Sequence, residues 1–301
     1  MNKLTIVFPL ALLAFLALEL LEYLPLLRQS AAVTDRSRSR WSRRDSALCL
    51  VLTLLYVPAA FFHLGDRQGI ESFCRFEERG ETVTVTLAEP TVLGKLRYYP
   101  GLFMAGYNLQ VSPDGSNYRP AGELEQKHAD LFKWREMQPD DVAAIPVRYV
   151  RLVALGREWL GELALYDADG NRLDAAAMEY PAEYTALFDE QEKIPAADSF
   201  MNGTYFDEIY HPRTALEHIE NIEPYEVSHP PLGKLILSLG IRLFGMVPFG
   251  WRFMGTLVGV LMLPIAYVFL KNVRRLSGAR RGNADPCHGL HALCPDPPCH
   301  H

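Results

Sequence analysis

The sequence predicts a mixed fold in which α-helical transmembrane segments are joined to an all-β sandwich domain. Three observations support this class: long apolar runs without any charge, hydrophobic side chains that alternate with a period of two between these runs, and arginines that cluster beside them. The 301 residues leave room for about two domains. A mean hydropathy of -0.02 is then the average of apolar and polar segments.

Two apolar runs have the length and composition of membrane-spanning helices. Residues 47–62 carry no charge, and residues 253–270 form an uncharged run of 18 residues. At 1.5 Å per residue the second run extends about 27 Å, close to the roughly 30 Å hydrocarbon core of a bilayer. The opening stretch, residues 4–27, carries Glu19 and Glu22 and is either a third membrane helix or a signal sequence. We expect a membrane helix, because the apolar run exceeds a normal signal core.

Basic residues set the expected orientation of these helices. Residues 28–44 hold one acid, Asp35, and six arginines: Arg28, Arg36, Arg38, Arg40, Arg43 and Arg44. The last apolar run is followed by five bases and no acid: Lys271, Arg274, Arg275, Arg280 and Arg281. The positive-inside rule places both basic segments in the cytoplasm and residues 65–251 on the extracytoplasmic side of a multi-pass cell-membrane protein. A nucleic-acid tail is the alternative, but the position between two apolar runs favours the topological interpretation.

Charge and cysteine content exclude several classes of protein. The formal net charge of -6 and the pI near 5.9 argue against a nucleic-acid partner, which selects for a basic excess. Five cysteines are too few for a disulfide-dense scaffold, and none form a Cys-x-x-Cys pair.

Short strands are expected over residues 65–175. Apolar side chains alternate along five segments: 81–87, 92–99, 107–111, 147–155 and 160–167. Turn residues interrupt them at Pro113-Asp114-Gly115 and at Asp167-Ala168-Asp169-Gly170. Regularly spaced short strands of this kind predict a β-sandwich or a β-barrel.

Three stretches of this region resemble the discoidin-like (F5/8 type C) jelly-roll family: YNLQVSPDGSNY, RYVRLVAL and GELALYDADGNRL. The resemblance implies a jelly-roll sandwich that binds glycans through loops at one end. The residues that would lie at such loop tips are Tyr98, Tyr99, Leu102, Phe103 and Trp134. We expect them to be core or strand residues instead, and no ligand residue carries over because these loops vary freely in the family.

An apparent calcium motif in the same region is not expected to bind metal. Asp167, Asp169 and Asn171 match the start of an EF-hand loop, but the twelfth position, which needs a bidentate Glu, is Met178. A β-turn between two strands explains these residues, so we predict no metal site, and the sequence indicates no certain cofactor.

Residues 176–230 are acidic, with twelve Asp or Glu against only Lys193 and Arg213. Most of these acids are expected to form a solvated face. Asp207 and Glu208 differ, because they are adjacent in a run of acids, histidines and prolines that directly precedes an apolar segment. One carboxylate could take a proton from an attacking hydroxyl while the other does a different job. For the pair alone, the first turn of a helix is the favoured interpretation.

Three motifs in residues 205–270 together change that assessment. They are FDE at Phe206 to Glu208, HPPLGK at His229 to Lys234, and FGWR at Phe249 to Arg252. With them the segment resembles the N-terminal part of the protein O-mannosyltransferase family and its bacterial relatives, membrane glycosyltransferases of the GT-C fold. The helices that precede it and the inserted sandwich fit the bacterial branch.

The resemblance implies transfer of a sugar, with mannose expected, from a polyprenyl-phosphate donor to a hydroxyl of a protein or glycan acceptor outside the membrane. Asp207 would be the general base, and Glu208 would hold the acceptor or order the site. His229 and Lys234 would shape the pocket near the lipid phosphate, and Arg252 would support the site. A carboxylate opposite cations suits an oxocarbenium-like centre and a departing phosphate. Lys234 has a second interpretation, a charge that snorkels from an amphipathic interfacial helix at 231–245.

The end of the chain departs from the family, whose members carry more transmembrane helices. The last residues hold three of the five cysteines and four of the nine histidines, without a standard zinc spacing: Cys287, His288, His291, Cys294, Cys299, His300 and His301. We interpret this tail as out-of-frame translation and the chain as a truncated transferase. Downstream nucleotides that encode no further apolar helices in another frame would exclude this.

Two other organisations stay open: a membrane-tethered carbohydrate-binding module without catalysis, and one subunit of a split transferase. Glycan binding by residues 65–175 alone would support the first, and co-purification with a multi-helix partner the second. The predicted segments are two transmembrane helices with a cytoplasmic loop (1–64), the sandwich (65–175), an extracytoplasmic loop (176–230), an interfacial and a transmembrane helix (231–275), and a disordered tail (276–301).

Overall fold

The computed structural model describes residues 41–140 and 145–282. The described residues form two compact units, one of residues 61–257 and one of residues 41–60 with 258–282. The expected first helix at 4–27 and the cysteine- and histidine-rich tail lie outside the described residues.

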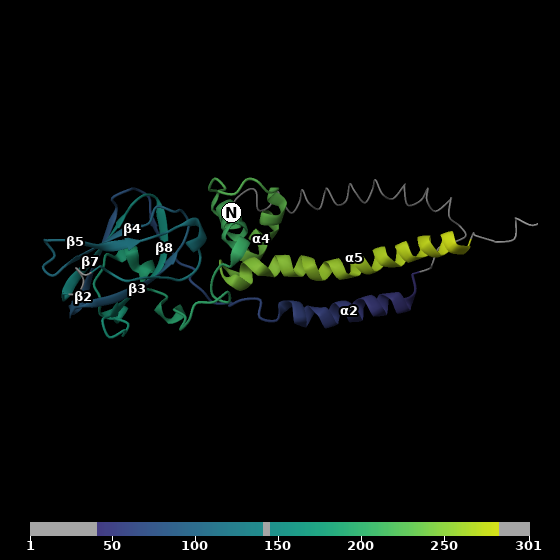
Figure 1. Cartoon of the computed structure of the whole chain (residues 1–301), viewed down its shortest axis with the longest axis horizontal. Helices are drawn as coiled ribbons and strands as arrows, with labels where there is room; N and C mark the ends of the chain where they lie inside the picture. The colour runs from purple at the N-terminus through teal and green to yellow at the C-terminus, as the bar shows by residue number, and fades with distance from the viewer. Residues whose placement is uncertain (1–40, 141–144, 283–301) are drawn as a thin grey trace, which may run out of the picture. The chain divides into compact units, whose positions relative to one another are not determined.

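Helices α2 (Arg43–Phe61) and α5 (Pro248–Gly282) are the two described helices that are long and apolar enough to cross a membrane (Figure 1). Their membrane-length portions are Arg43–Phe61 and Pro248–Lys271, and only 6% of the apolar window of each is buried. A core helix of a soluble domain would be mostly buried. The two predicted apolar helices are confirmed as helices of spanning length.

Polar contacts join α2 and α5 within the smaller unit. The Lys271 ammonium lies 2.5 Å from one carboxylate oxygen of Asp45, and the Tyr267 hydroxyl donates to the other at 2.9 Å. Lys271 also lies 5.2 Å from the centre of the Trp41 ring. The basic start of α2 is therefore beside the first base that follows the apolar run of α5.

The sandwich consists of two four-stranded antiparallel sheets (Figure 1). The first has the order β1 (Cys74–Phe76), β8 (Glu158–Asp167), β3 (Leu93–Pro100), β6 (Arg135–Met137). The second has the order β2 (Thr82–Thr91), β7 (Val147–Ala154), β4 (Tyr107–Ser112), β5 (Arg119–Leu124). This architecture confirms the sandwich.

The alternation of side chains explains the core between the sheets. Along β2, Val83, Val85 and Leu87 are buried while their neighbours are not. Val83 pairs with Leu152 and Val85 with Val150 on β7, so apolar side chains face apolar side chains across the sheet. All five predicted strands are present. The three that were not predicted are short, or in β5 contain Pro and Gly.

Residues that follow the last strand also belong to the sandwich. They form the short 3-10 helices η3 (Ala175–Ala177), η4 (Ala182–Leu187) and η5 (Gln191–Lys193). Leu187 and Phe188 are buried in the core of the sandwich. Thr86 and Glu179 exchange two backbone hydrogen bonds of 2.8 and 3.0 Å. The first third of the predicted 176–230 loop is thus packed against the sheets.

Beyond this segment the chain builds three helical elements: η6 (Phe206–Ile209), α3 (His211–Glu220) and α4 (Pro231–Phe244). Helices α4 and α5 approach closely where Gly240 of α4 meets Gly250 of α5: a Cβ at Gly240 would lie 2.4 Å from the carbonyl oxygen of Gly250. A Cβ at Gly250 would lie 2.2 Å from the carbonyl oxygen of Gly245, in the turn between the two helices. This crossing positions the start of α5 beside η6.

Candidate active site

The acidic pair lies in the first turn of η6, and the two side chains have different surroundings. Phe206 has a positive φ of 50°, which is unusual for a residue with a side chain, and its ring is 77% exposed. Glu208 accepts a hydrogen bond from the Tyr205 N–H at 3.0 Å. The helix-turn interpretation of the pair therefore holds for Glu208, whose carboxylate stabilises the turn.

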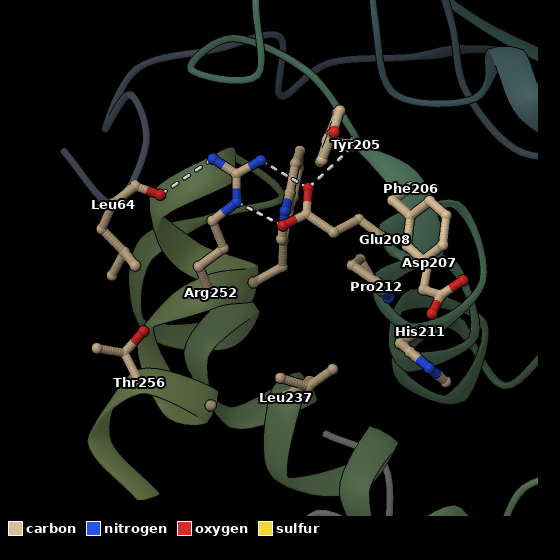
Figure 2. Close-up of a pocket in the computed structure, with 12 residues that line it drawn as sticks. Leu64, Tyr205, Phe206, Asp207, Glu208, His211, Pro212, Leu237, Arg252 and Thr256 are labelled. Atoms are coloured by element: carbon tan, nitrogen blue, oxygen red, sulfur yellow. Dashed lines mark hydrogen bonds and ion pairs between the residues drawn. The ribbon is translucent and has the colours of Figure 1, made fainter. Parts of the chain in front are cut away.

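Glu208 is also bound by Arg252, from α5. Arg252 Nε lies 2.5 Å from Glu208 Oε1, and Arg252 Nη2 lies 2.6 Å from Oε2 (Figure 2). The guanidinium donates further to the carbonyl oxygens of Leu64 at 3.0 Å and Gly203 at 3.3 Å. Three parts of the sequence, around Leu64, residues 203–208 and Arg252, are thus joined at one side chain. The supporting role of Arg252 in the site stays a prediction, and the structure shows the contacts through which it would act.

Glycine at position 65 allows this assembly. Its φ is +143°, and an added Cβ would lie 2.6 Å from the Cβ of Pro248 and 2.9 Å from Arg252 Nη1. The adjacent Asp66 accepts a backbone hydrogen bond from Phe249 at 3.1 Å. The segment that leaves α2 therefore packs directly on the first turn of α5.

A pocket of about 470 Å³ opens beside the ion pair. Twelve residues line it: Leu64, Tyr205, Phe206, Asp207, Glu208, His211, Pro212, Leu237, Trp251, Arg252, Gly255 and Thr256. Figure 2 shows the Asp207 carboxylate turned away from Arg252 and toward the His211 ring. In the described part of the chain no side chain forms a hydrogen bond or ion pair with the Asp207 carboxylate. Asp207 and Glu208 thus point in different directions, one free and one held.

His229 and Lys234 lie outside the pocket wall, around Glu226. Lys234 is buried, with 4% of its side chain exposed, and donates to the carbonyl oxygen of Glu226 at 2.7 Å and to its carboxylate. The Lys234 ammonium, with the Ser228 hydroxyl, lowers the pKa of Glu226. His229 Nδ1 lies 3.1 Å from the same carboxylate. Glu226 therefore holds the HPPLGK motif in a turn that leads into α4. The contact between Lys234 and Glu226 explains why Lys234 is buried, so the snorkelling interpretation is not needed.

His229 reaches the pocket through a second histidine. The rings of His211 and His229 meet edge to face, with centroids 5.5 Å apart. Sequence reasoning missed both His211 and Glu226 as members of the site. His211 comes four residues after Asp207 and could have been suggested by that spacing in a helical turn. No sequence pattern points to Glu226, because its contacts with His229 and Lys234 form only in the folded turn.

Most of the acids of residues 176–230 are exposed, as expected, but two are buried and have structural partners. Glu217 is buried, accepts from Arg213 Nε at 2.8 Å and from the Tyr225 N–H at 2.8 Å, and so joins α3 to the next turn. Glu190 is buried as well and accepts from the N–H groups of Glu71 and Ser72 at 2.8 and 3.2 Å.

The sandwich region agrees with two further predictions. Tyr98, Tyr99, Leu102 and Trp134 are buried, and Phe103 packs against them, so these side chains are core residues. Asp167 accepts from the Asn171 N–H at 2.8 Å in a turn that has Gly170 at φ +84°. Among the described residues, one cluster of three carboxylates lies close enough together to hold a metal ion: Glu162, Asp189 and Glu190. The cluster belongs to the sandwich, and Lys193 forms an ion pair with its member Glu190.

Comparisons with known proteins place these observations in context. No family model matches the chain. The polyprenol-phosphate-mannose–protein mannosyltransferase of Mycobacterium tuberculosis is 32% identical over 109 residues, which are 35% of this chain and 18% of that protein. Its namesake from Corynebacterium glutamicum is 34% identical over 99 residues, 33% of this chain and 17% of the relative. The Mycolicibacterium smegmatis protein of that name is 30% identical over 101 residues, again 33% and 17%.

The matched part thus spans under a fifth of the length of these relatives. Among solved structures, CpGH89CBM32-5 from Clostridium perfringens, in complex with GalNAc-β-1,3-galactose, aligns with 33% of this chain and 85% of its own, at 21% identity and a TM-score of 0.25. These relatives confirm the resemblance that the motifs indicate: over about a third of its length, the chain is similar to bacterial polyprenol-phosphate-mannose–protein mannosyltransferases.

Proposed function

We propose that this chain carries the Asp-Glu site of a GT-C-type membrane mannosyltransferase. It would transfer mannose from a polyprenyl-phosphate donor to a hydroxyl of a protein or glycan acceptor on the extracytoplasmic side. The named activity of the relatives supports the donor and the acceptor class. The observation that carries the proposal is the free Asp207 carboxylate in a pocket whose other acid, Glu208, is already held by Arg252.

The proposed reaction is a substitution at the anomeric carbon. The acceptor oxygen forms a bond to this carbon, the bond from the carbon to the phosphate oxygen breaks, and the lipid phosphate leaves with the electron pair. The proton of the hydroxyl passes to Asp207. General-base help of this kind contributes roughly 10²- to 10⁴-fold in rate. An unpaired carboxylate at a pocket wall is free to approach the hydroxyl.

Glu208 takes the ordering role in this scheme. Both of its oxygens accept from Arg252, and one accepts from the Tyr205 N–H as well. Of the two roles expected for it, holding the acceptor or ordering the site, this arrangement supports ordering. The pair fixes η6 against α5 and so sets the direction of Asp207.

The two spanning-length helices support the proposed placement in the membrane. Arg43 and Arg44 begin α2, and Lys271 contacts Asp45 near that same helix end. The positive-inside rule puts this end in the cytoplasm. Residues 61–257 would then face outward, where a polyprenyl-linked sugar and a secreted acceptor can meet.

Transfer of radiolabelled mannose tests the proposal. Membranes that contain the full chain receive either polyprenyl-phosphate mannose or GDP-mannose. We expect transfer to protein or glycan from the lipid donor alone. Transfer from GDP-mannose in membranes depleted of polyprenyl phosphate, or no transfer from either donor, would contradict it.

Accessibility labelling tests the orientation. A cysteine placed at Ser116, in an exposed turn of the sandwich, should react with an impermeant maleimide in intact cells, whereas a cysteine at Ser42 should react only after the membrane is opened. The reverse pattern would place Asp207 in the cytoplasm and exclude the proposed site.

A further inference from the structure

The Glu208–Arg252 ion pair leaves the charge of one further acid in the pocket, Asp207, without a partner from the lining. Of the twelve lining residues, four are acidic or basic: Asp207, Glu208, His211 and Arg252. Glu208 and Arg252 neutralise each other at 2.5 and 2.6 Å. A phosphate that enters would therefore meet the acidic Asp207, and His211 is the one basic lining residue that is not already in an ion pair. Burying an anion without a cation or a donor is costly, so the pocket needs such a group.

Lys234 cannot supply the missing positive charge. Its ammonium is buried and bonded to the carbonyl and carboxylate of Glu226, and it does not line the pocket. Four of the five N–H donors of Arg252 are used as well, on Glu208, Leu64 and Gly203. The two cations suggested by the sequence are thus occupied with protein partners.

His211 has the position and the support for this task. It is the first residue of α3, where the positive end of the helix dipole also favours a bound anion. Its ring lies at the pocket wall on the side of the Asp207 carboxylate (Figure 2). The edge of the His229 ring packs against it, and Glu226 holds His229 through Nδ1 at 3.1 Å. A ring supported in this way loses little side-chain entropy on binding.

We propose that His211 is the binding residue for the phosphate of the polyprenyl donor and that His229 positions it. This inference rests on the proposed function, and it assigns to the HPPLGK motif an indirect role, through His211. An N–H of the His211 imidazole donates a hydrogen bond to a phosphate oxygen, and the same contact stabilises the phosphate as it leaves the sugar.

Binding of two lipids that differ only in the phosphate tests the assignment. The full chain in lipid nanodiscs is titrated with undecaprenyl phosphate and with undecaprenol. The wild type should prefer the phosphate. His211→Gln should weaken binding of the phosphate about tenfold or more, the range expected for a charge-assisted hydrogen bond, and leave the alcohol unchanged. Unchanged alcohol binding also shows that the variant is folded.

His128 offers a matched control, because it is exposed and stacks on Tyr210 beside the site without lining the pocket. His128→Gln should keep the preference for the phosphate, and His229→Gln should reduce it by a smaller factor than His211→Gln. Inorganic phosphate at the same concentration should compete weakly, since it lacks the lipid.

The outcomes separate the two proposals. A His211→Gln variant that keeps the full preference for undecaprenyl phosphate overturns the role of His211 and leaves the transferase proposal in place. A wild-type chain that binds neither lipid overturns both. Displacement of undecaprenyl phosphate by inorganic phosphate at an equal concentration would assign the site to a free anion and also overturn the inference.

Discussion

Arg252 and Glu208 form a two-point ion pair, with Nε 2.5 Å from Oε1 and Nη2 2.6 Å from Oε2. The pair joins the FGWR motif to the FDE motif, which are 44 residues apart. The two side chains are 13% and 24% exposed, so water and salt screen their attraction less than they would on the surface. This contact explains why two separate motifs belong to one site.

The first prediction concerns this ion pair. Arg252→Lys should retain the charge but lose the fork and the bond to Leu64, and Glu208→Gln should lose the charge. A double-mutant cycle on the free energy of unfolding in detergent should give a coupling of about 1.5–3 kcal/mol, as for hydrogen bonds to charged groups. A coupling near zero would show that the two side chains do not depend on each other.

The second prediction concerns the crossing of α4 and α5. Gly240→Ala places a Cβ 2.4 Å from the carbonyl oxygen of Gly250, so the helices must separate, and Gly250→Ala places one 2.2 Å from the carbonyl oxygen of Gly245, so the turn between the helices must shift. Each should lower the free energy of unfolding by about 1–3 kcal/mol, as overpacking does. Gly233→Ala, in α4 with no atom near its Cβ, is the matched control and should be neutral or stabilising by up to about 1 kcal/mol. Equal effects at all three positions would contradict the close crossing.

The third prediction concerns pH and the buried carboxyl of Glu158. Burial raises the pKa of this carboxyl from 4.5 to about 8, and its Oε2 has no partner among the described residues. Burial likewise raises the pKa of Glu162 to about 8. Between pH 4.5 and 8 the folded chain holds protons that the unfolded chain has released, so the free energy of unfolding falls as pH rises through this window. Above pH 8 the contribution is lost and the curve is flat.

Denaturation at pH 5.5 and pH 8 measures this effect. Glu158→Gln keeps an acceptor for the Gly106 N–H, which donates to Oε1 at 3.0 Å, and cannot titrate. The variant should lose less stability than the wild type on going to pH 8, with a difference of at most about 1.4 kcal/mol per pH unit. Burial lowers the pKa of His218, which gives the opposite slope in both proteins and cancels in the difference. Identical slopes would mean that Glu158 is ionised in the folded chain.

The fourth prediction concerns the end of the sandwich. A fragment of residues 65–204 should unfold at a higher temperature than one of residues 65–175, because Leu187 and Phe188 are buried in the core. Each buried side chain of this size is worth about 1.5–3 kcal/mol. Phe188→Ala in the longer fragment should lose part of the gain in melting temperature. Circular dichroism melts of the three proteins provide the comparison, and equal melting temperatures would exclude the packed extension.

Much of the fold could be predicted from local pattern. The alternation in residues 81–87 specifies which face of a strand is buried, and the structure has strand β2 there. The uncharged run at 253–270 specifies a helix of membrane-spanning length, and it lies within α5. β1 and β6 have three residues each and are too short to show an alternation of apolar and polar residues. β5 contains Pro120 and Gly122, which are unfavourable in strands, so its sequence does not predict one. Those strands depend on neighbours that the sheet supplies.

The residues of the candidate site could likewise be predicted only in part. Motifs identified Asp207, Glu208 and Arg252, which the fold brings together, because these residue types are chemically distinctive. The roles of His229 and Lys234 could not be assigned from sequence, since both depend on Glu226, a residue whose position is set by a tertiary turn. His211 was overlooked for a similar reason: a single histidine acquires meaning only when a pocket forms around it.

The central claim is that Asp207 accepts the proton of the attacking hydroxyl while Glu208 keeps the site in order. The most direct test is kcat for mannose transfer by Asp207→Asn, together with its affinity for undecaprenyl phosphate. Asp169→Asn, in a turn of the sandwich, is the matched control. We predict that kcat falls by about 100-fold or more in Asp207→Asn alone, with lipid affinity retained. A kcat equal to that of the wild type would contradict the assignment of the base.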